Sequence, residues 1–169
     1  MPAEFPYRST MRPDDLLLCV YEKYENLAAS KGISLQFSLV DAAYRDCALD
    51  TERITQVLSI LMDNALSYTP QGGKILLLLS QSAHHTIFAV ADDGSSIPEE
   101  EKAHIFERFY RTDHAHTDHD HFGLGLCTAQ EIVRAHHGKI LVHDPRDCSP
   151  LPEGFPRDRG VVFTVVLHG

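Results

Sequence analysis

The sequence predicts a single α+β domain, and three observations lead to this prediction. Apolar residues recur at spacings of three and four along three long stretches, as they do on the buried face of a helix. Five other stretches are rich in Ile, Leu, Val and Phe, in the short runs or alternation typical of strands. The chain has 169 residues, of which 43% are hydrophobic, and a chain of this size buries about two thirds of its unfolded surface.

Two helices and a strand are predicted in the N-terminal part of the chain. Pro13 and Asp14 begin a helix that ends before Gly32. Residues 33–39 then alternate between apolar and polar side chains, which predicts a strand with one buried face. Asp50 is the expected N-cap of a second amphipathic helix.

Two strands and a short helix are predicted next. Residues 69–73 contain one Pro and two Gly, which end the second helix. Residues 74–82 include a run of Ile and Leu that indicates a strand buried on both faces, and residues 86–92 return as another strand. A short helix is expected from Pro98, because Pro in the first turn and acidic residues near the N-terminus favour a helix start.

The C-terminal part is predicted to contain a loop, a helix and two strands. Residues 112–122 are polar and lack an apolar period, so we expect a mobile lid. The last helix ends at Gly138, and strands are expected at residues 139–142 and 161–167. Four prolines within residues 145–160 indicate a loop between these strands.

Charge and composition exclude several classes of function. The formal net charge is −9, and Lys and Arg form no dense stripe, so nucleic acid is not expected as a partner. The longest apolar run, residues 75–79, is too short to cross a bilayer, and the N-terminus lacks the pattern of a secretion signal. We therefore expect no membrane contact by this domain. The cysteines are expected to be reduced, and Cys127 is expected to fill the core.

Two glycine-containing turns indicate a nucleotide site. The first, Asp92-Asp93-Gly94-Ser95-Ser96-Ile97, ends an apolar strand with a carboxylate and brings backbone close to a flat ligand. The second, Gly123-Leu124-Gly125-Leu126, opens a helix whose free N–H groups and dipole favour phosphate. Between them lies Phe106-Glu107-Arg108-Phe109-Tyr110-Arg111, in which Phe106 and Phe109 are expected to anchor the segment in the core. One glycine turn alone would say little, but the ordered set predicts nucleotide binding.

Four side chains near these turns have the chemistry that a nucleotide requires. The amide oxygen of Asn64 can complete the shell of a Mg²⁺ that water and phosphate oxygens otherwise hold. Taken alone, a solvent-facing Asn is the simpler interpretation. Asp92 can accept a hydrogen bond from an exocyclic amine, although taken alone it is an ordinary turn residue. Arg108 and Arg111 can neutralise the β- and γ-phosphates.

This order of features resembles the ATP-binding catalytic domain of sensor histidine kinases, over residues 14–167. The order is a helix with Asn64, a strand-end Asp-x-Gly, a Phe-x-Arg-Phe-Tyr-Arg segment, a polar loop and Gly-x-Gly-Leu on a helix. The resemblance places the chain with gyrase, heat-shock chaperone and mismatch-repair ATPases, in the GHKL superfamily. It implies the Bergerat fold, an α+β two-layer sandwich with an ATP lid. In this fold a mixed, mostly antiparallel sheet of about five strands packs on three helices.

The resemblance also implies roles for individual residues. Asn64 is expected to coordinate magnesium, Asp92 to bind the adenine amine, and the second glycine turn to contact the phosphates. Arg108 and Arg111 are expected, together with Asn64, to act on the transferred phosphoryl group. The full set expected to contact Mg²⁺-ATP is Asn64, Tyr68, Asp92, Gly94, Ile97, Phe109, Gly123, Leu124, Gly125 and Leu126.

Five positions depart from the usual pattern of this family. Ile60 stands where a polar residue is usual one turn before Asn64, and Ser67 stands where a phosphate-contacting Lys is frequent. Ser96 replaces the second glycine of the first turn, and His121-Phe122 replaces a frequent Gly-Thr. These changes motivate an alternative, a degenerate nucleotide-binding or non-catalytic regulatory module that acts through partner contacts. A serine kinase acting on an anti-sigma antagonist has a similar fold, but the Phe-Glu-Arg-Phe-Tyr-Arg segment disfavours it.

The resemblance implies partners as well. In this family a helical dimerisation domain with a phosphoacceptor histidine precedes the catalytic domain, whereas the first histidine here is His84. Residues 1–12 are therefore expected to be the remnant of a tether to that domain, and residues 13–169 the catalytic domain. A response regulator receiver domain is expected to take the phosphoryl group afterwards. The intact protein is expected to be anchored in the bacterial inner membrane, with this domain in the cytoplasm.

Four histidines of the expected lid, His114, His116, His119 and His121, form a His-x-His-x-x-His-x-His pattern. Imidazoles at this density can bind Zn²⁺ or Ni²⁺, but a loop that does not fix their orientation makes a poor specific site. Solvated lid residues are the simpler interpretation. A further hypothesis is that their protonation below about pH 6.5 changes the charge of the lid and the retention of nucleotide.

Overall fold

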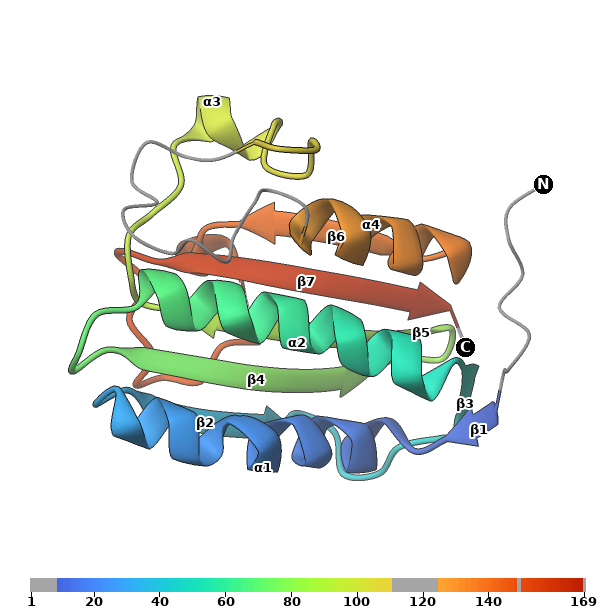
Figure 1. Ribbon diagram of the computed structural model, residues 1–169. Coiled ribbons are helices and arrows are strands. Elements are labelled where there is room, and N and C mark those ends of the chain that lie inside the picture. Colours follow the sequence, from blue (N-terminus) through green and yellow to red (C-terminus); the bar gives the residue numbers. More distant parts are fainter. Residues whose placement is uncertain (1–8, 111–124, 149, 169) are drawn as a thin grey trace.

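A five-stranded sheet carries helices on one face and a long connection on the other (Figure 1). The computed structural model describes residues 9–110, 125–148 and 150–168. Across the sheet the order of strands is β2 (Ser34–Leu39), β4 (Lys74–Gln81), β5 (His85–Asp92), β7 (Val161–His168) and β6 (Lys139–His143). β2 pairs with β4 in parallel, and the other pairs are antiparallel. The predicted mixed, mostly antiparallel sheet is therefore confirmed.

Three amphipathic helices form the second layer: α1 (Pro13–Ser30), α2 (Thr51–Tyr68) and α4 (Gly125–Ala135). α1 begins with a Pro, whose missing N–H has no partner to lose in the first turn. Asp50 caps α2, because its carboxylate accepts a hydrogen bond from the Arg53 N–H at 3.1 Å. The apolar sides of the helices pack on the sheet and build the main core, which confirms the predicted two-layer sandwich. Within the described ranges, none of the helices has the length and apolarity needed to cross a membrane.

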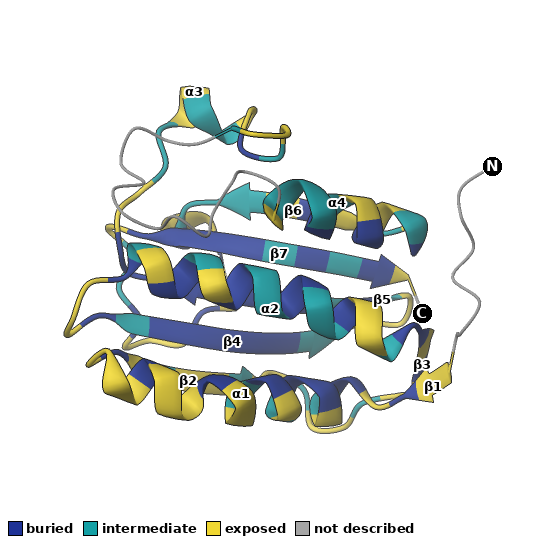
Figure 2. Cartoon of the chain, viewed as in Figure 1, coloured by how far each residue is buried: buried dark blue, intermediate teal, exposed yellow. Residues whose placement is uncertain are grey.

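Burial differs between the centre and the edge of the sheet (Figure 2). Residues 75–79 of β4 are buried on both faces, as their run of Ile and Leu predicts. In contrast, the predicted buried face of β2 is wrong, since Phe37 is 43% exposed and Leu39 is 38% exposed. β2 is an edge strand that α1 covers only in part, where the rings of Tyr21 and Phe37 meet edge to face at 5.0 Å.

Three short elements lie outside the main layers. β1 (Ser9–Met11) and β3 (Cys47–Leu49) pair antiparallel as a separate ribbon. The sequence pattern does not predict them, because three residues are too few to show a period. Met11 is buried in the main core, so the end of the segment expected to be a tether packs on the domain. The short helix expected after Pro98 is confirmed as α3 (Glu99–Lys102).

The connection between β6 and β7 covers part of the sheet face opposite the helices (Figure 1). It begins with a 3₁₀ turn, η1 (Pro145–Asp147), and then places Cys148, Leu151 and Phe155 against the sheet. The guanidinium of Arg157 fixes its course by donating hydrogen bonds to the carbonyl oxygens of Cys148 at 2.9 Å and Leu151 at 2.7 Å. The expected loop therefore also builds a second small core. Its partners on the sheet are Leu76, Leu78, Ala89, Ala91 and Val162.

Cys127 does not fill the core, and that prediction is wrong. The residue is only partly buried in the first turn of α4, where its Sγ donates to the Glu131 carboxylate at 3.7 Å. The buried side of α4 is formed by Ala129, Ile132 and Val133. Position 127 falls beside this stripe, so its thiol lies at the boundary between the core and solvent.

The second core predicts unequal effects for two leucines on the same side of the sheet. Leu151 is 4% exposed beneath the connection, whereas Leu141 of β6 is 47% exposed. We expect Leu151→Ala to lower the free energy of unfolding by about 2–4 kcal/mol, because it leaves a cavity among packed side chains. Leu141→Ala, the matched control, should cost about 1 kcal/mol or less. Urea denaturation followed by circular dichroism measures both effects, and equal losses would show that the connection does not pack on the sheet.

Candidate functional site

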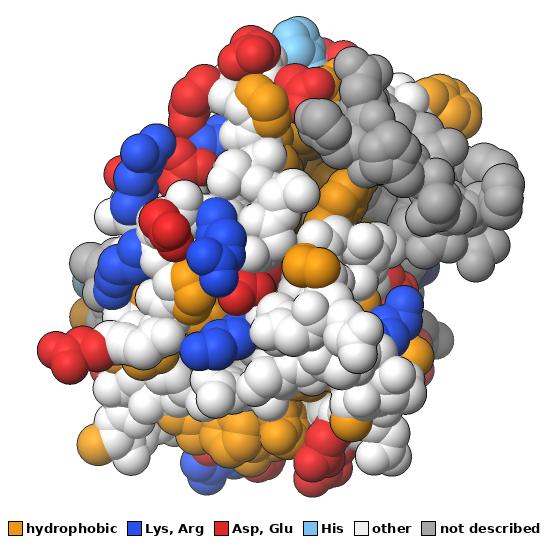
Figure 3. Space-filling model, turned by 90° about the vertical axis from the view of Figure 1, so that its left-hand side faces the viewer, with side chains coloured by type: hydrophobic (Ala, Val, Ile, Leu, Met, Phe, Trp, Pro, Cys, Tyr) orange, Lys and Arg blue, Asp and Glu red, His pale blue; other side chains and the backbone are white. Residues whose placement is uncertain are grey.

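The first glycine turn lies at the end of the sheet where β5 ends and β7 begins. Asp92 is the last residue of β5 and stands opposite Val161, the first residue of β7. We call residues 92–96 the acidic turn. Figure 3 looks onto this end of the molecule, where Lys and Arg side chains alternate with Asp and Glu and apolar side chains show between them. The site is built where α2 and β5 end and where β4 and β7 begin.

Two glycines allow neighbouring backbone to approach the acidic turn closely. A Cβ atom on Gly94 would lie 2.2 Å from the carbonyl oxygen of Tyr68, the last residue of α2. A Cβ atom on Gly160 would lie 1.8 Å from the carbonyl oxygen of Asp92. Gly160 also has a φ of +100°, which side-chain-bearing residues rarely adopt. The turn therefore fits only because both positions lack a side chain, and this fit fixes the place of Asp92.

Asp92 is a buried carboxyl group without a cationic partner. It is 2% exposed, and its Oδ1 accepts a hydrogen bond from the Gly94 N–H at 2.9 Å. Burial, with a smaller contribution from the negative charge of Asp93, raises the pKa of Asp92 to about 7, although backbone N–H groups of Gly94 and Val161 oppose the rise. Among the described residues, no Lys, Arg or His forms an ion pair with it. The oxygens of this carboxyl group can therefore accept a further hydrogen bond from a donor group on a ligand.

Asp93 ties the acidic turn to β4 and to the residues before β7. Its Oδ1 accepts from the Lys74 N–H at 2.7 Å, and its own N–H donates to the Lys74 carbonyl oxygen at 3.1 Å. On the other side, Arg159 Nη2 lies 3.6 Å from Asp93 Oδ2, and Arg159 Nε donates to the Asp93 carbonyl oxygen at 3.1 Å. The sequence does not predict these contacts, because an acidic turn residue and a loop Arg are each common on surfaces.

Ser96 replaces the usual glycine of the family without strain. Its φ is not positive, so the backbone tolerates a side chain at this position. Its Oγ accepts a hydrogen bond from the Gly160 N–H at 3.2 Å, which joins the acidic turn to the start of β7. Ile97 follows and packs, partly buried, against the main core. This departure from the family pattern therefore contributes a contact to the site.

α2 brings Asn64 and Tyr68 to the same end of the molecule. Both are half-buried and stand one turn apart on one side of the helix. The carbonyl oxygen of Tyr68 meets Gly94 of the acidic turn. One turn before Asn64, Ile60 packs on the main core, and its Cγ2 lies 3.4 Å from the Cβ position of Gly125, the first residue of α4. Asn64 therefore lies along α2 between the acidic turn and the start of α4.

The segment that begins at Phe106 is anchored in the core by one phenylalanine and not by two. Phe106 is partly buried, and its ring meets that of Phe163 edge to face at 6.2 Å. Phe109 does not anchor the core as predicted, because it is 66% exposed on a backbone that reverses with a φ of +64°. The Arg108 guanidinium lies 5.9 Å from the Phe109 ring. Burial and the Glu131 carboxylate raise the pKa of the Cys127 thiol in the first turn of α4, and the positive charge of Arg108 opposes this rise.

Part of the predicted site lies outside the described residues. Of the second glycine turn, Gly125 begins α4, and Leu126 packs partly buried against the main core. Within the described ranges, no three His, Cys, Asp or Glu side chains gather as they would around a metal ion. The predicted residues outside these ranges are Arg111, Gly123 and Leu124, together with the lid residues His114, His116, His119 and His121.

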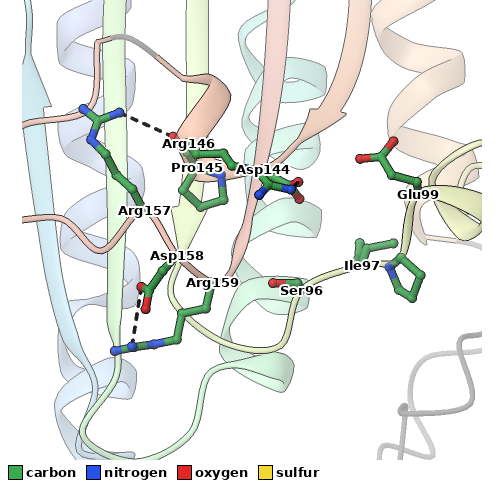
Figure 4. Close-up of a pocket in the computed structure, with 10 residues that line it drawn as sticks. Ser96, Ile97, Glu99, Asp144, Pro145, Arg146, Arg157, Asp158 and Arg159 are labelled. Carbon is green, nitrogen blue, oxygen red and sulfur yellow. Dashed lines mark hydrogen bonds and ion pairs between the residues drawn. The ribbon is translucent and has the colours of Figure 1, made fainter.

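A cavity of about 280 Å³ adjoins the acidic turn (Figure 4). Residues 96–99 form one wall, and residues 144–146 and 157–159 of the β6–β7 connection form the other. Of the described residues assigned to nucleotide, the cavity is lined by Ile97 alone, and its wall also includes Ser96 of the acidic turn. Two ion pairs lie within its own walls, Asp144 with Arg146 and Asp158 with Arg159. This cavity therefore adjoins the acidic turn on the side of the β6–β7 connection.

Known proteins share both the sequence pattern and the fold. Residues 49–168 match the family described as "Histidine kinase-, DNA gyrase B-, and HSP90-like ATPase". Sensor protein CiaH of Streptococcus pneumoniae is 35% identical over 133 residues, which cover 78% of this chain and 30% of CiaH. The adaptive-response sensory kinase SasA of Nostoc sp. is 42% identical over 94 residues, which cover 55% of this chain and 23% of SasA. The chain spans less than a third of the length of these two relatives.

Solved structures extend the likeness to almost the whole chain. The nucleotide-free catalytic domain of histidine kinase ThkA superposes with a TM-score of 0.78 and 28% identity, covering 96% of this chain and 97% of that domain. Full-length ShkA in complex with AMPPNP has the same fold, with a TM-score of 0.78 and 24% identity over 99% of this chain and 32% of ShkA. The chain therefore belongs to the histidine kinase-, DNA gyrase B- and HSP90-like ATPase family, as an ATP-binding catalytic domain of the sensor histidine kinase type.

Proposed function

We propose that this domain binds Mg²⁺-ATP and presents the γ-phosphoryl group to a histidine on a separate helical domain. The observation that carries the proposal is the buried carboxyl group of Asp92, which has no cationic partner among the described residues. A buried acceptor of this kind suits a neutral ligand edge with N–H donors, such as the amine of adenine. Gly94 supports the same assignment, because its missing side chain lets the acidic turn pack against the Tyr68 carbonyl oxygen, which fixes the place of Asp92.

A second polar group favours a ligand at this end of the molecule. Thr69 follows α2 and is 6% exposed, and within the described residues its hydroxyl oxygen has no hydrogen-bond partner. Its methyl group and the Asp93 carboxylate both border Gly73, so the two side chains lie close together. Buried polar groups are ordinarily satisfied, and an exception at a site points to a ligand or water as the missing partner.

The phosphates are assigned to the start of α4 and its neighbours. α4 is 11 residues long from Gly125, and its first turn carries no acidic residue. The N–H groups and dipole at a helix N-terminus favour an anion. Arg108, whose charge acts on Cys127 in that turn, adds a positive charge. Asn64 would complete the oxygen shell of Mg²⁺ from the side of α2.

Phosphoryl transfer by this domain depends on positioning. When bound, ATP supplies the phosphoryl group and Mg²⁺ offsets its charge. The acceptor imidazole is itself the nucleophile, so no general base is required among the residues of this domain. The acidic turn holds the purine, and α4 with Arg108 orients the phosphates. The purine is then held at the end of the sheet and the phosphates at the start of a helix that packs on the same core.

The partners are inferred from the relatives. CiaH is named a sensor protein and SasA a sensory kinase, and ThkA has been solved in complex with the response regulator TrrA. For the intact protein we infer a helical dimerisation and phosphoacceptor domain, joined through residues 1–12. A response regulator receiver domain then takes the phosphoryl group. We also infer a cytoplasmic position for this domain, in a protein anchored in the bacterial inner membrane.

A regulatory module that binds nucleotide without transferring phosphoryl is the second candidate function. Ile60 packs on the core and beside Gly125, so it offers no polar contact there. The hydroxyl of Ser67 donates to the Asp63 carbonyl oxygen at 3.0 Å within its own helix. Incubation with Mg²⁺-ATP and a supplied phosphoacceptor domain separates the two functions. Phosphohistidine formation supports the kinase, and tight binding without transfer supports the module.

Calorimetric titration with Mg²⁺-ATP tests the purine site. We expect the unaltered domain to bind and Asp92→Ala to weaken binding by about 100-fold, because the purine amine loses a buried acceptor. Asp147→Ala, at an exposed position of the β6–β7 connection, is the matched control and should leave the affinity unchanged. Absence of binding by the unaltered domain would exclude both candidate functions.

The close approach at Gly94 predicts a second effect on affinity. Gly94→Ala forces the acidic turn away from the Tyr68 carbonyl oxygen, so we expect about a tenfold loss of ATP affinity and a loss of about 1–3 kcal/mol in stability. Gly154→Ala is the control, because a Cβ there meets nothing within 4 Å. Fluorescent-nucleotide binding and thermal denaturation measure the two effects. If both variants behave like the unaltered domain, the turn is not fixed against α2.

Asp92 is predicted to destabilise the domain at neutral pH. Its pKa in the folded state, about 7, lies above its ordinary value, so the unfolded chain releases this proton at lower pH than the folded one. Its contribution to stability is complete below about pH 4 and is lost as the pH rises to about 7. We therefore expect the stability gained by Asp92→Asn to grow by about 2–3 kcal/mol between pH 5 and pH 8. Urea denaturation measures this difference, and a constant gain at both pH values would refute the assignment.

A further inference from the structure

Two adjacent carboxyl groups are buried at the end of β5. Asp92 is 2% exposed and Asp93 is 5% exposed. The negative charge of Asp93 disfavours the ionised form of Asp92. A purine amine is bound more strongly by an ionised acceptor than by a neutral one. The charge on Asp93 therefore bears directly on what Asp92 can bind.

Arg159 is the cation that meets Asp93. Its Nη2 lies 3.6 Å from Asp93 Oδ2, and its Nε donates to the Asp93 carbonyl oxygen at 3.1 Å. The next residue, Gly160, is fixed to the acidic turn through the hydrogen bond of its N–H to Ser96 Oγ at 3.2 Å. The backbone from which Arg159 extends is therefore held in register with Asp92. Arg159 is also 55% exposed, so water reduces the strength of its charge without removing it.

Other charged or titratable groups around the acidic turn do not replace Arg159. Lys74 of β4 contacts the turn through its backbone N–H and carbonyl oxygen. Tyr68 of α2 contacts it through a carbonyl oxygen. Asp158 lies 3.7 Å from the Arg159 guanidinium and is 80% exposed, where solvent screens its charge. Among the described residues, the ion pair to Asp93 comes from Arg159.

We propose that Arg159 is a positioning residue of the nucleotide site, which neutralises Asp93 and so keeps Asp92 ionised to accept the purine amine near neutral pH. The purine half of this inference rests on the proposed function, whereas its electrostatic half applies to the domain without nucleotide. Arg159 belongs to the β6–β7 connection, the segment that also covers the back of the sheet. Through Arg159, the connection then affects how strongly nucleotide binds, in addition to completing the second small core.

Titration of the Asp92 carboxyl carbon by NMR, in the nucleotide-free domain, tests the electrostatic half. Arg159→Gln should move the Asp92 midpoint upward by about 0.5 pH units, because a partly exposed charge acts on it through Asp93. Asp93→Asn should move the midpoint downward, because it removes the neighbouring negative charge. When Asp93 is already Asn, adding Arg159→Gln should produce a markedly smaller shift, since the charge that Arg159 neutralises is gone.

Two further variants separate charge from structure. Arg146→Gln removes the same charge from the same connection, at a residue that is 72% exposed and paired with Asp144, and should leave the Asp92 midpoint in place. Arg159→Lys keeps the charge and should stay near the unaltered midpoint. A midpoint that Arg159→Gln does not move, or that Arg146→Gln moves equally, overturns the proposal.

ATP affinity measured by calorimetry from pH 6 to pH 9 connects the charge to function. Arg159→Gln should weaken binding about threefold at pH 6 and about twofold at pH 7, and approach the unaltered affinity at pH 9, where Asp92 is ionised in both proteins. A merely structural role would weaken binding equally at every pH. If the unaltered domain binds no ATP, the proposed function fails, and the NMR titration still decides the electrostatic half. If it binds ATP but Arg159→Gln leaves the pH profile unchanged, this inference fails and the proposed function stands.

Discussion

Close packing of backbone around Asp92 is the constraint on which the site depends. The acidic turn touches the Tyr68 carbonyl oxygen, the Lys74 N–H and the Gly160 backbone. Backbone in packed elements cannot move aside as a flexible side chain can, so the carboxyl group is fixed in place and shielded from water. Burying it costs stability that the rest of the core offsets. Such a local cost is typical of a site that binds a ligand.

The β6–β7 connection links this site to the packing of the sheet. Leu151 and Phe155 hold the connection on the back face, and Arg157 fixes its course by binding its carbonyl oxygens. Two residues later, Arg159 reaches the carboxylate of Asp93. The position of Arg159, and with it the positive charge beside Asp93, therefore depends on the packing of the second small core. The connection holds Arg159 in this position from the face of the sheet that the helices do not cover.

Most of the fold follows from periodicity, and the exceptions have physical causes. The long helices and the main strands repeat their apolar residues often enough to be recognised, and Asp50 caps α2 as its residue type favours. β1 and β3 are too short to show a period. The exposure of Phe37 depends on the place of β2 at the sheet edge, which periodicity along one strand does not reveal. Phe109 is exposed because the backbone reverses at that residue.

The candidate site was predictable where its residues share a local motif. Asp92 and Gly94 are neighbours in one turn, so the sequence displays them together. Arg159 donates to a residue 66 positions earlier in the chain, and only the pairing of β5 with β7 brings the two together. The electrostatic environment of Asp92 therefore emerges from tertiary structure and not from the motif.

Amide chemical-shift changes during titration with a non-hydrolysable ATP analogue and Mg²⁺ test the location of the site most directly. We expect the largest changes at residues 92–94 and in the first turn of α4. The amides of residues 144, 146 and 157, on the far wall of the neighbouring cavity, should change little. Changes confined to that wall, or no changes at all, would contradict a purine site centred on Asp92.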